Sequence, residues 1–285
     1  MTAFKDKSAT EFAEKSYLSR VVVYLESEED RLIIGDRWFY DENLEFRSAG
    51  EEGQGGGCNQ VIRKVTDDKE KGIKSVGLVD RDVLLKDCHW ACWWEHDDTA
   101  FRGCQPYGEN IKVLSRWEIE NYLLVEPDII ASVKADRFGR AQERPAPIPL
   151  SSEEISLFTM LTAADVCCHA VGKKKISDSM AGFSGTSQEL RASLEKKGID
   201  SAALDEKLDK AVCFAGDEND DPVKQWRQIN RILNGKAILN RLQLLGKKQG
   251  DATDYRLALA RKIADDDKID PEIRDYIAAF RKMKP

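Results

Sequence analysis

Short apolar runs alternate with longer amphipathic stretches through the first 130 residues of the chain. Runs at 21–25, 44–47, 75–79 and 111–114 predict strands, because short runs rich in apolar and β-branched residues are typical of buried sheets. Residues 26–42 and 59–71 have helical spacing, and another helix is expected to begin near Trp117. This alternation predicts an α/β fold, a Rossmann-like parallel sheet with helices on both faces.

The pattern changes near residue 145. Pro145, Pro147 and Pro149 mark a linker, and no strand pattern follows them. Helical patterns cover about 151–170, 187–213, 222–246 and 253–283, with a polar Gly/Ser loop at 177–187. We therefore expect an α/β domain at 1–144 and an all-helical region at 150–285.

The composition is that of a soluble globular protein. Of its 285 residues 33% are charged and 41% hydrophobic, no stretch is apolar for long enough to span a membrane, and the N-terminus lacks a secretory apolar segment. The seven cysteines are odd in number and irregularly spaced, which favours a reducing compartment. We expect a cytoplasmic protein without membrane contact.

The charge is unevenly distributed. A net charge of −7 is not typical of a general nucleic-acid binder. Residues 222–250 nevertheless contain no acid and seven cations: Lys224, Arg227, Arg231, Lys236, Arg241, Lys247 and Lys248. At helical spacing this segment either offers one face to phosphates or carries an ordinary solvated basic face, and both interpretations stay open.

Acidic residues follow two of the expected strands directly. Glu26 comes after 21–25, and Asp80 and Asp82 come after 75–79. The carboxyl ends of parallel strands meet at one edge of the sheet, which is where open α/β folds bind ligands. Several carboxylates gathered there need a cation, and oxygen ligands suit Mg²⁺ or Mn²⁺ better than zinc. The alternative for Asp80 and Asp82 is a turn after a buried strand.

Four motifs together resemble one known family. They are LESEED (from Leu25), LVDRD (from Leu78), SRWEIENYLL (from Ser115) and NGKAILNRL (from Asn234). This ordered set is similar to TOPRIM nucleases of the OLD-like type, in particular the toxic effectors of PARIS anti-phage defence. Where the family turn has Gly after its Glu, this chain has Ser27, which resists a positive φ and puts the loop geometry in doubt.

The resemblance implies an activity and partners. The chain would be a metal-dependent TOPRIM endonuclease, a toxin of abortive infection restrained by an ABC-type ATPase partner (AriA-like). Its implied substrate is host RNA, with tRNA the leading candidate, and the active form is expected to be a homodimer. Residues after 150 would then serve dimerisation, partner docking or nucleic-acid contact.

The candidate site residues follow from the motifs. Glu26, Asp80 and Asp82 are the expected first metal ligands, and Asp30, Glu118 and Glu120 are candidates for a second metal or for orienting water. Two residues apart on one helix, Glu118 and Glu120 point in different directions, so we expect at most one to face the site and favour Glu120 as catalytic. Lys236 would supply positive charge to the scissile phosphate, or is an ordinary exposed lysine after an Asn-Gly turn.

Two further patterns resemble binding sites in part, a zinc site and a P-loop. Cys88, His89, Cys92, His96 and Cys104 could hold zinc, but the interleaved Trp90, Trp93 and Trp94 favour a packed insertion, or a stacking or protein-contact surface. The glycines at 53–57 are no P-loop, because no Gly-Lys-Ser/Thr follows them. Any dependence on ATP is therefore expected to come from a partner.

Four other functions are alternatives to a ribonuclease. The chain can be a DNA-directed TOPRIM nuclease, because no RNA-binding fingerprint is present. It can be a catalytically inactive TOPRIM binding or assembly subunit, although the retained acidic set speaks against this. An aspartyl phosphatase would carry its D-x-D after the first strand instead of the third, and a topoisomerase would need a much longer chain.

Overall fold

The computed structural model describes residues 20–41, 43–50, 57–138, 148–180, 182–216, 219–244 and 252–283. The chain divides into two compact units, which we call the sheet unit and the helical unit. The sheet unit comprises Met1–Val79, Tyr107–Lys112 and Asp270–Pro285; the helical unit comprises Asp80–Pro106 and Val113–Ile269. The expected linker prolines Pro145 and Pro147 lie outside the described residues, and the division at 144–150 stays a prediction.

The sheet unit is built on a four-stranded parallel sheet, the α/β architecture that the sequence predicts. The strands lie in the order β2-β1-β3-β4, and β1 pairs in parallel with both β2 and β3. All five residues of β1 and of β3 are buried, as expected for central strands. The strands are β1 (Val21–Leu25), β2 (Leu44–Ser48), β3 (Ser75–Val79) and β4 (Ile111–Val113).

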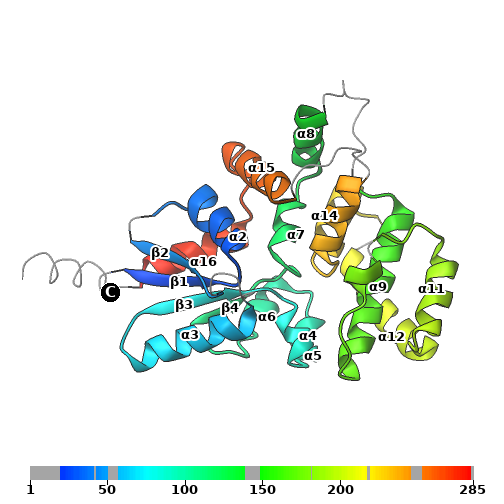
Figure 1. Cartoon of the computed structure of the whole chain (residues 1–285), viewed down its shortest axis with the longest axis horizontal. Coiled ribbons are helices and arrows are strands. Elements are labelled where there is room, and N and C mark those ends of the chain that lie inside the picture. Colours follow the sequence, from blue (N-terminus) through cyan, green and yellow to red (C-terminus); the bar gives the residue numbers. More distant parts are fainter. Residues whose placement is uncertain are drawn as a thin grey trace, which may run out of the picture. The chain divides into compact units, whose positions relative to one another are not determined.

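The strand order places helices on both faces of this sheet. The chain moves outward from β1 to β2, then returns across β1 to β3, and right-handed crossovers put these two connections on opposite faces. Helix α2 contacts β1 and β2, whereas α3 contacts β1 and β3 (Figure 1). The helices are α2 (Glu28–Arg31), a π-helical continuation η1 (Leu32–Trp38), α3 (Cys58–Glu70) and α16 (Pro271–Arg281).

Small residues let these helices approach the strands. A Cβ on Gly77 of β3 would lie 2.4 Å from Val61 Cγ1 of α3, and one on Gly35 of η1 would lie 2.8 Å from Phe46 Cβ of β2. Both distances are far below van der Waals contact, so only glycine fits at either position.

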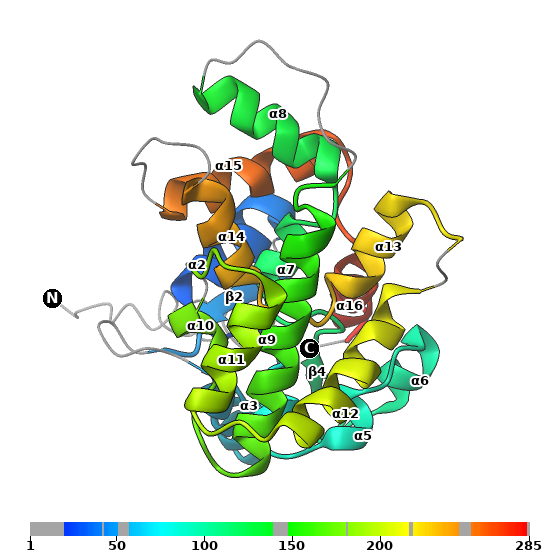
Figure 2. The ribbon, with the colours of Figure 1, turned by 90° about the vertical axis from the view of Figure 1, so that its right-hand side faces the viewer.

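The helical unit is centred on α9, whose residues 157–168 are all buried. Helices α10, α11 and α12 pack around it (Figure 2). No described helix is long and apolar enough to cross a membrane. The described helices of this unit are α4 (Val83–Lys86), α5 (Trp90–Trp93), α6 (Asp98–Gly103), α7 (Ile119–Leu123), α8 (Pro127–Phe138), α9 (Ser152–Ala170), α10 (Ser177–Met180), α11 (Ser187–Lys196), α12 (Ser201–Val212), η2 (Cys213–Ala215), α13 (Pro222–Ile229), α14 (Gly235–Leu244) and α15 (Ala252–Asp265).

Three of the predicted long helices are each two helices. The 187–213 stretch breaks at Gly198, whose φ of +81° ends α11. The 222–246 stretch breaks between α13 and α14, before Gly235, and the 253–283 stretch breaks before Pro271, the first residue of α16. The apolar spacing continued through these breaks, so periodicity alone did not reveal them.

Candidate active site

The turn after β1 holds two of the predicted residues. Glu26 is half-buried, and Ser27 caps α2 with extended backbone at φ −132°. The Asp30 amide donates to Ser27 Oγ (3.1 Å), while the Ser27 amide donates to Asp30 Oδ2 (3.0 Å). Because Ser27 has a negative φ, this capping box needs no glycine at residue 27. It also fixes the Asp30 carboxylate beside the turn that carries Glu26.

The turn after β3 carries the D-x-D motif. Asp80 directly follows the strand and is 8% exposed. Asp82 precedes α4 and lies near two lysines, with Lys86 Nζ at 3.2 Å and Lys175 Nζ at 3.9 Å. Burial lowers the pKa of His169, and the nearby Asp82 carboxylate opposes that shift. Lys175 and His169 were not predicted, because they lie about 90 residues along the chain from Asp82.

Arg81, between the two aspartates, was also missed. Its side chain is 0% exposed, and its guanidinium donates to four backbone carbonyls. The shortest of these bonds reach Ser115 O (2.5 Å) and Trp93 O (2.6 Å). Arg81 therefore ties the D-x-D turn to the Trp-rich segment and to the strand end that leads to α7. An arginine between two turn aspartates was the only sequence signal for this role.

The Trp-rich segment is packed around this guanidinium. The rings of Phe101, Trp93 and Phe214 lie 4.3, 5.5 and 5.3 Å from Arg81 Cζ, and Trp93 packs edge-on against Trp117. Burial and a hydrogen bond with Cys104 raise the pKa of the Cys92 thiol to about 11, which keeps it protonated. These contacts match the expectation of a packed insertion, and they remove Trp93 from any stacking surface.

The SRWEIENYLL and NGKAILNRL motifs meet inside the helical unit, across 118 residues of sequence. Lys236, in the first turn of α14, lies 3.1 Å from Glu118 Oε2 and 3.9 Å from Glu120 Oε2. Both carboxylates are buried, at 1% and 2% exposure, whereas the Lys236 side chain is 47% exposed. Glu118 is the N-cap of α7 and has extended backbone, so the helical-direction argument for Glu118 and Glu120 was wrong. Both face the same cation.

Asparagines hold this junction together. Asn121 Nδ2 donates to the carbonyls of Asn230 (2.7 Å) and Leu233 (2.9 Å), and Asn230 Nδ2 donates back to Asn121 O (2.8 Å). A Cβ on Gly235 would lie 2.6 Å from Asn121 Oδ1 and 2.9 Å from the Asn121 amide nitrogen. The glycine before Lys236 is therefore required by close packing on α7.

A second cation reaches Glu120. Arg256 of α15 places Nη2 2.9 Å from Glu120 Oε1. The Arg256 side chain is 12% exposed, so this ion pair is largely shielded from solvent. Sequence reasoning missed Arg256, because nothing in its own neighbourhood distinguishes it from other helical arginines.

The described cations of the basic segment at 222–250 pair with acids of the same unit. Lys224 pairs with Asp220 (2.6 Å), Arg227 binds both carboxylate oxygens of Glu126, and Arg231 lies 2.7 Å from Asp98. With Arg241 on Glu154 and Lys236 on Glu118, no described arginine or lysine of this segment is left without an acid. Lys247 and Lys248 lie outside the described residues. Of the two interpretations left open for this segment, the pairing of its described cations with acids favours a basic face engaged within the protein.

The expected metal ligands differ in how well they suit Mg²⁺ or Mn²⁺. Glu26, Asp80 and Asp82 supply carboxylate oxygens, the donors that these ions prefer. Glu118 contacts the amide and the ammonium of Lys236, and Glu120 Oε1 lies 2.9 Å from Arg256 Nη2, so either acid would have to exchange a cation partner to bind a metal ion. Within the described ranges, no three His, Cys, Asp or Glu side chains form a group placed to hold a metal ion. The metal assignments stay predictions.

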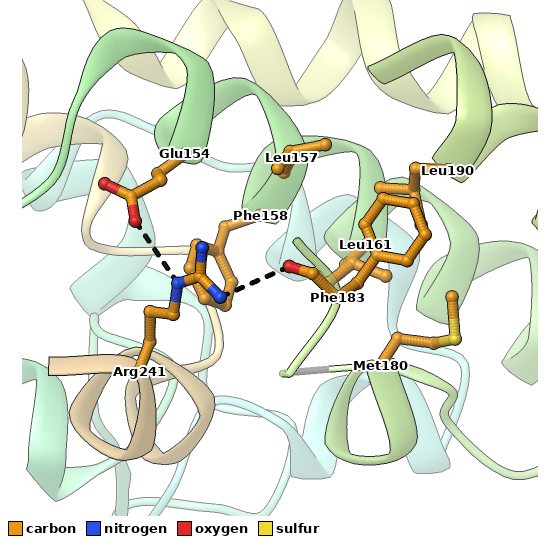
Figure 3. Close-up of a pocket in the computed structure, with 8 residues that line it drawn as sticks. All are labelled: Glu154, Leu157, Phe158, Leu161, Met180, Phe183, Leu190 and Arg241. Atoms are coloured by element: carbon orange, nitrogen blue, oxygen red, sulfur yellow. Dashed lines mark hydrogen bonds and ion pairs between the residues drawn. The ribbon is translucent and has the colours of Figure 1, made fainter. Parts of the chain in front are cut away.

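The cavity between α9, α10, α11 and α14 is not a ligand site. Arg241 bridges Glu154 and the Phe183 carbonyl at its rim, while apolar side chains line the interior (Figure 3). Its volume of about 10 Å³ is enough for roughly one water molecule. Burial alone would raise the pKa of Glu154, but hydrogen bonds from Ser151 and Arg241 lower it overall. This cavity is a packing feature.

Comparison with known proteins adds no further assignment. No protein-family model matches the chain, and no curated protein matches it significantly.

Proposed function

We propose that the chain is a metal-dependent endonuclease of the TOPRIM type, cleaving phosphodiester bonds of host RNA such as tRNA. In the same proposal it is an AriB-like cytoplasmic effector of an anti-phage defence system, restrained by an ABC-type ATPase and active as a homodimer. The seven cysteines, all free thiols, support a reducing compartment.

One observation carries this proposal. The strand order β2-β1-β3-β4 has its topological switch point between β1 and β3, because the connections from these strands lead in opposite directions. Open α/β sheets bind ligands at the carboxyl ends of the two strands that flank this point. Those strands are followed directly by Glu26 and by Asp80. Acidic residues at both places fit an oxygen-ligated divalent ion better than a phosphate group.

The side chains suggest a division of roles. Glu26, Asp80 and Asp82 would hold the ion, which when bound stabilises charge on the phosphate oxygens and activates water. Lys236 keeps its ammonium at the surface over two buried carboxylates, where it can contact a phosphate. Glu118 and Glu120 act in this proposal as positioning residues that hold Lys236, with Arg256 compensating the second acid.

A second candidate function is a binding or assembly subunit without catalysis. The pairing of Glu118 and Glu120 with cations favours it, because acids held in ion pairs are poor metal ligands. It predicts that the acids after β1 and β3 can be replaced without loss of activity in the cell.

The test uses the purified chain without partner on total tRNA and on plasmid DNA, with Mg²⁺ or Mn²⁺ and with EDTA. We expect metal-dependent cleavage of tRNA that Glu26→Ala abolishes and Lys236→Ala weakens at least about tenfold. Glu70→Ala, at the exposed end of α3, is the matched control and should cleave normally.

Each alternative predicts a different result. Cleavage of plasmid alone would assign the enzyme to DNA. Toxicity retained in Glu26→Ala cells would remove the catalytic assignment and favour the binding subunit. Wild-type cleavage by Lys236→Ala would exclude Lys236 from the site.

A further inference from the structure

Four lysines at one end of the helical unit form no salt bridge within the described part of the chain. They are Lys173 and Lys174, after α9, and Lys196 and Lys197, at the end of α11; all four are exposed. Most other described cations of this unit contact an acid, including Lys224, Arg231 and Arg241 of the 222–250 segment. Four of the exposed lysines that form no described salt bridge therefore lie at the ends of these two helices, and Lys268 is another such lysine elsewhere in the unit.

The two lysine pairs lie side by side. Helices α9 and α11 pack together, and both end in a glycine with positive φ, Gly172 (+68°) and Gly198 (+81°). A Cβ on Gly198 would lie 3.9 Å from Lys173 Nζ, so the Lys173 ammonium sits over the turn that follows Lys197. We call residues 173–175 and 196–197 the lysine patch.

The lysine patch reaches the D-x-D turn. Lys175, its least exposed member, lies 3.9 Å from Asp82 Oδ2. Asp165 holds this loop, because its Oδ1 accepts the amides of Ile176 (2.5 Å) and Ser177 (2.9 Å). The patch is thus linked to Asp82 through Lys175 and to the end of α11 through Lys173.

The local charge opposes that of the whole protein. The patch holds five lysines in a chain of net charge −7. Lys175 interacts with Asp82 and Asp165, whereas the acids next to the other four lysines in sequence are Glu195 and Asp200. Glu195 accepts the Ser201 hydroxyl, and Asp200 caps α12 through the Ala203 amide. Neither acid forms an ion pair with the patch, which leaves a basic surface of the kind that phosphate backbones recognise.

We propose that the lysine patch binds the phosphate backbone of the nucleic-acid substrate beside the candidate active site. The inference rests on the proposed function and adds to it the surface along which the strand runs. Backbone contacts of this kind position a substrate without reading its sequence. A purely structural role, in which the lysines offset the negative ends of α9 and α11, is the competing account.

The test measures binding separately from cleavage. In a Glu26→Ala background, Lys173, Lys174, Lys196 and Lys197 are replaced by Gln, and binding of a labelled 30-nucleotide single-stranded RNA is followed by fluorescence anisotropy at several NaCl concentrations. Each lost phosphate contact reduces the slope of log K against log salt by about 0.7 to 0.9, so we expect the slope to fall by about 3. Affinity at low salt should fall by at least about tenfold.

The matched control removes the same charge elsewhere. It replaces Lys69, Lys71, Lys268 and Lys282, exposed lysines outside the patch, by Gln. An unchanged slope in the patch variant, an equal loss in both variants, or no RNA binding by the parent would overturn the proposal. So would a lower melting temperature with unchanged binding, which is the signature of the structural role.

The outcomes also separate this inference from the nuclease assignment. A reduced slope in the patch variant, with no cleavage by the wild-type chain in metal, would support the surface and reject the nuclease. Metal-dependent cleavage by the wild-type chain, with an unchanged salt slope in the patch variant, would support the nuclease and reject the lysine patch as the binding surface. Loss of poly-glutamate binding with unchanged RNA binding would assign the patch to an acidic protein partner and overturn the proposal.

Discussion

Replacing Arg81 with methionine should cost the helical unit a large part of its stability. The substitution keeps a side chain of similar length but removes every donor of a guanidinium that is 0% exposed. Four carbonyls lose their bonds to it, those of Cys92, Trp93, Glu95 and Ser115. The cation also leaves its site between the rings of Phe101, Trp93 and Phe214.

The magnitude follows from these contacts. A hydrogen bond to a charged group contributes about 1.5–3 kcal/mol, and a buried acceptor left unpaired costs about 1–3 kcal/mol. Part of this loss is offset, because the variant no longer has to desolvate a charge. We expect a net decrease of about 3–4 kcal/mol in the free energy of unfolding, against a typical total of about 5–15 kcal/mol. Arg81→Lys keeps the charge but offers at most three donors, and should lose about 2 kcal/mol.

Urea unfolding followed by tryptophan fluorescence measures the effect, because Trp93 lies against the replaced group. With a denaturant slope of about 2–3 kcal/mol/M, the midpoint of Arg81→Met should fall by more than about 1 M. Arg261→Met is the matched control, since the Arg261 side chain is 74% exposed and its ion pair with Asp265 is long at 3.6 Å. A midpoint for Arg81→Met equal to that of the control would refute the reasoning.

Two further substitutions test the packing and the electrostatics of the helical unit. Gly235→Ala should lower the free energy of unfolding by about 1–3 kcal/mol, because its Cβ would overlap the Asn121 backbone, whereas Gly103→Ala, with open space around it, should be near neutral in the same urea titration. Burial raises the pKa of Asp165 to about 6, although hydrogen bonds from Ser177 and Ile176 oppose the shift. A raised carboxyl pKa contributes stability that is present below about pH 4 and lost as pH rises through about 6, so the wild type should lose up to about 3 kcal/mol across that window relative to Asp165→Asn. Parallel profiles for the two proteins in urea titrations at pH 4 and pH 6.5 would contradict this.

The apolar pattern of the sequence was sufficient to predict the strands of the sheet. The four strands were predicted within one residue at each end, and so were Glu26 and Asp80 at the ends of β1 and β3. Strand burial and the spacing of apolar residues are local properties, so they can be read from neighbouring residues. The points where one helix ends and the next begins were harder to predict from the sequence. Apolar spacing continues through Gly198 and Gly235, and only the backbone geometry interrupts the helix there.

Side-chain partners depended on packing between distant segments. Lys236 meets Glu118 across 118 residues, and Arg227 meets Glu126 across 101. Nothing near Lys236 in the sequence distinguishes an anchored ammonium from an exposed one, and nothing near Arg227 shows that an acid neutralises it. Charge along the chain therefore left open whether 222–250 offers a phosphate-binding face or an ordinary basic face. The folded unit pairs the described cations of this segment with acids and leaves Lys173, Lys174, Lys196 and Lys197 without a described salt bridge. Local hydrogen bonding and burial set the elements, but a charge is satisfied or left exposed only when those elements pack.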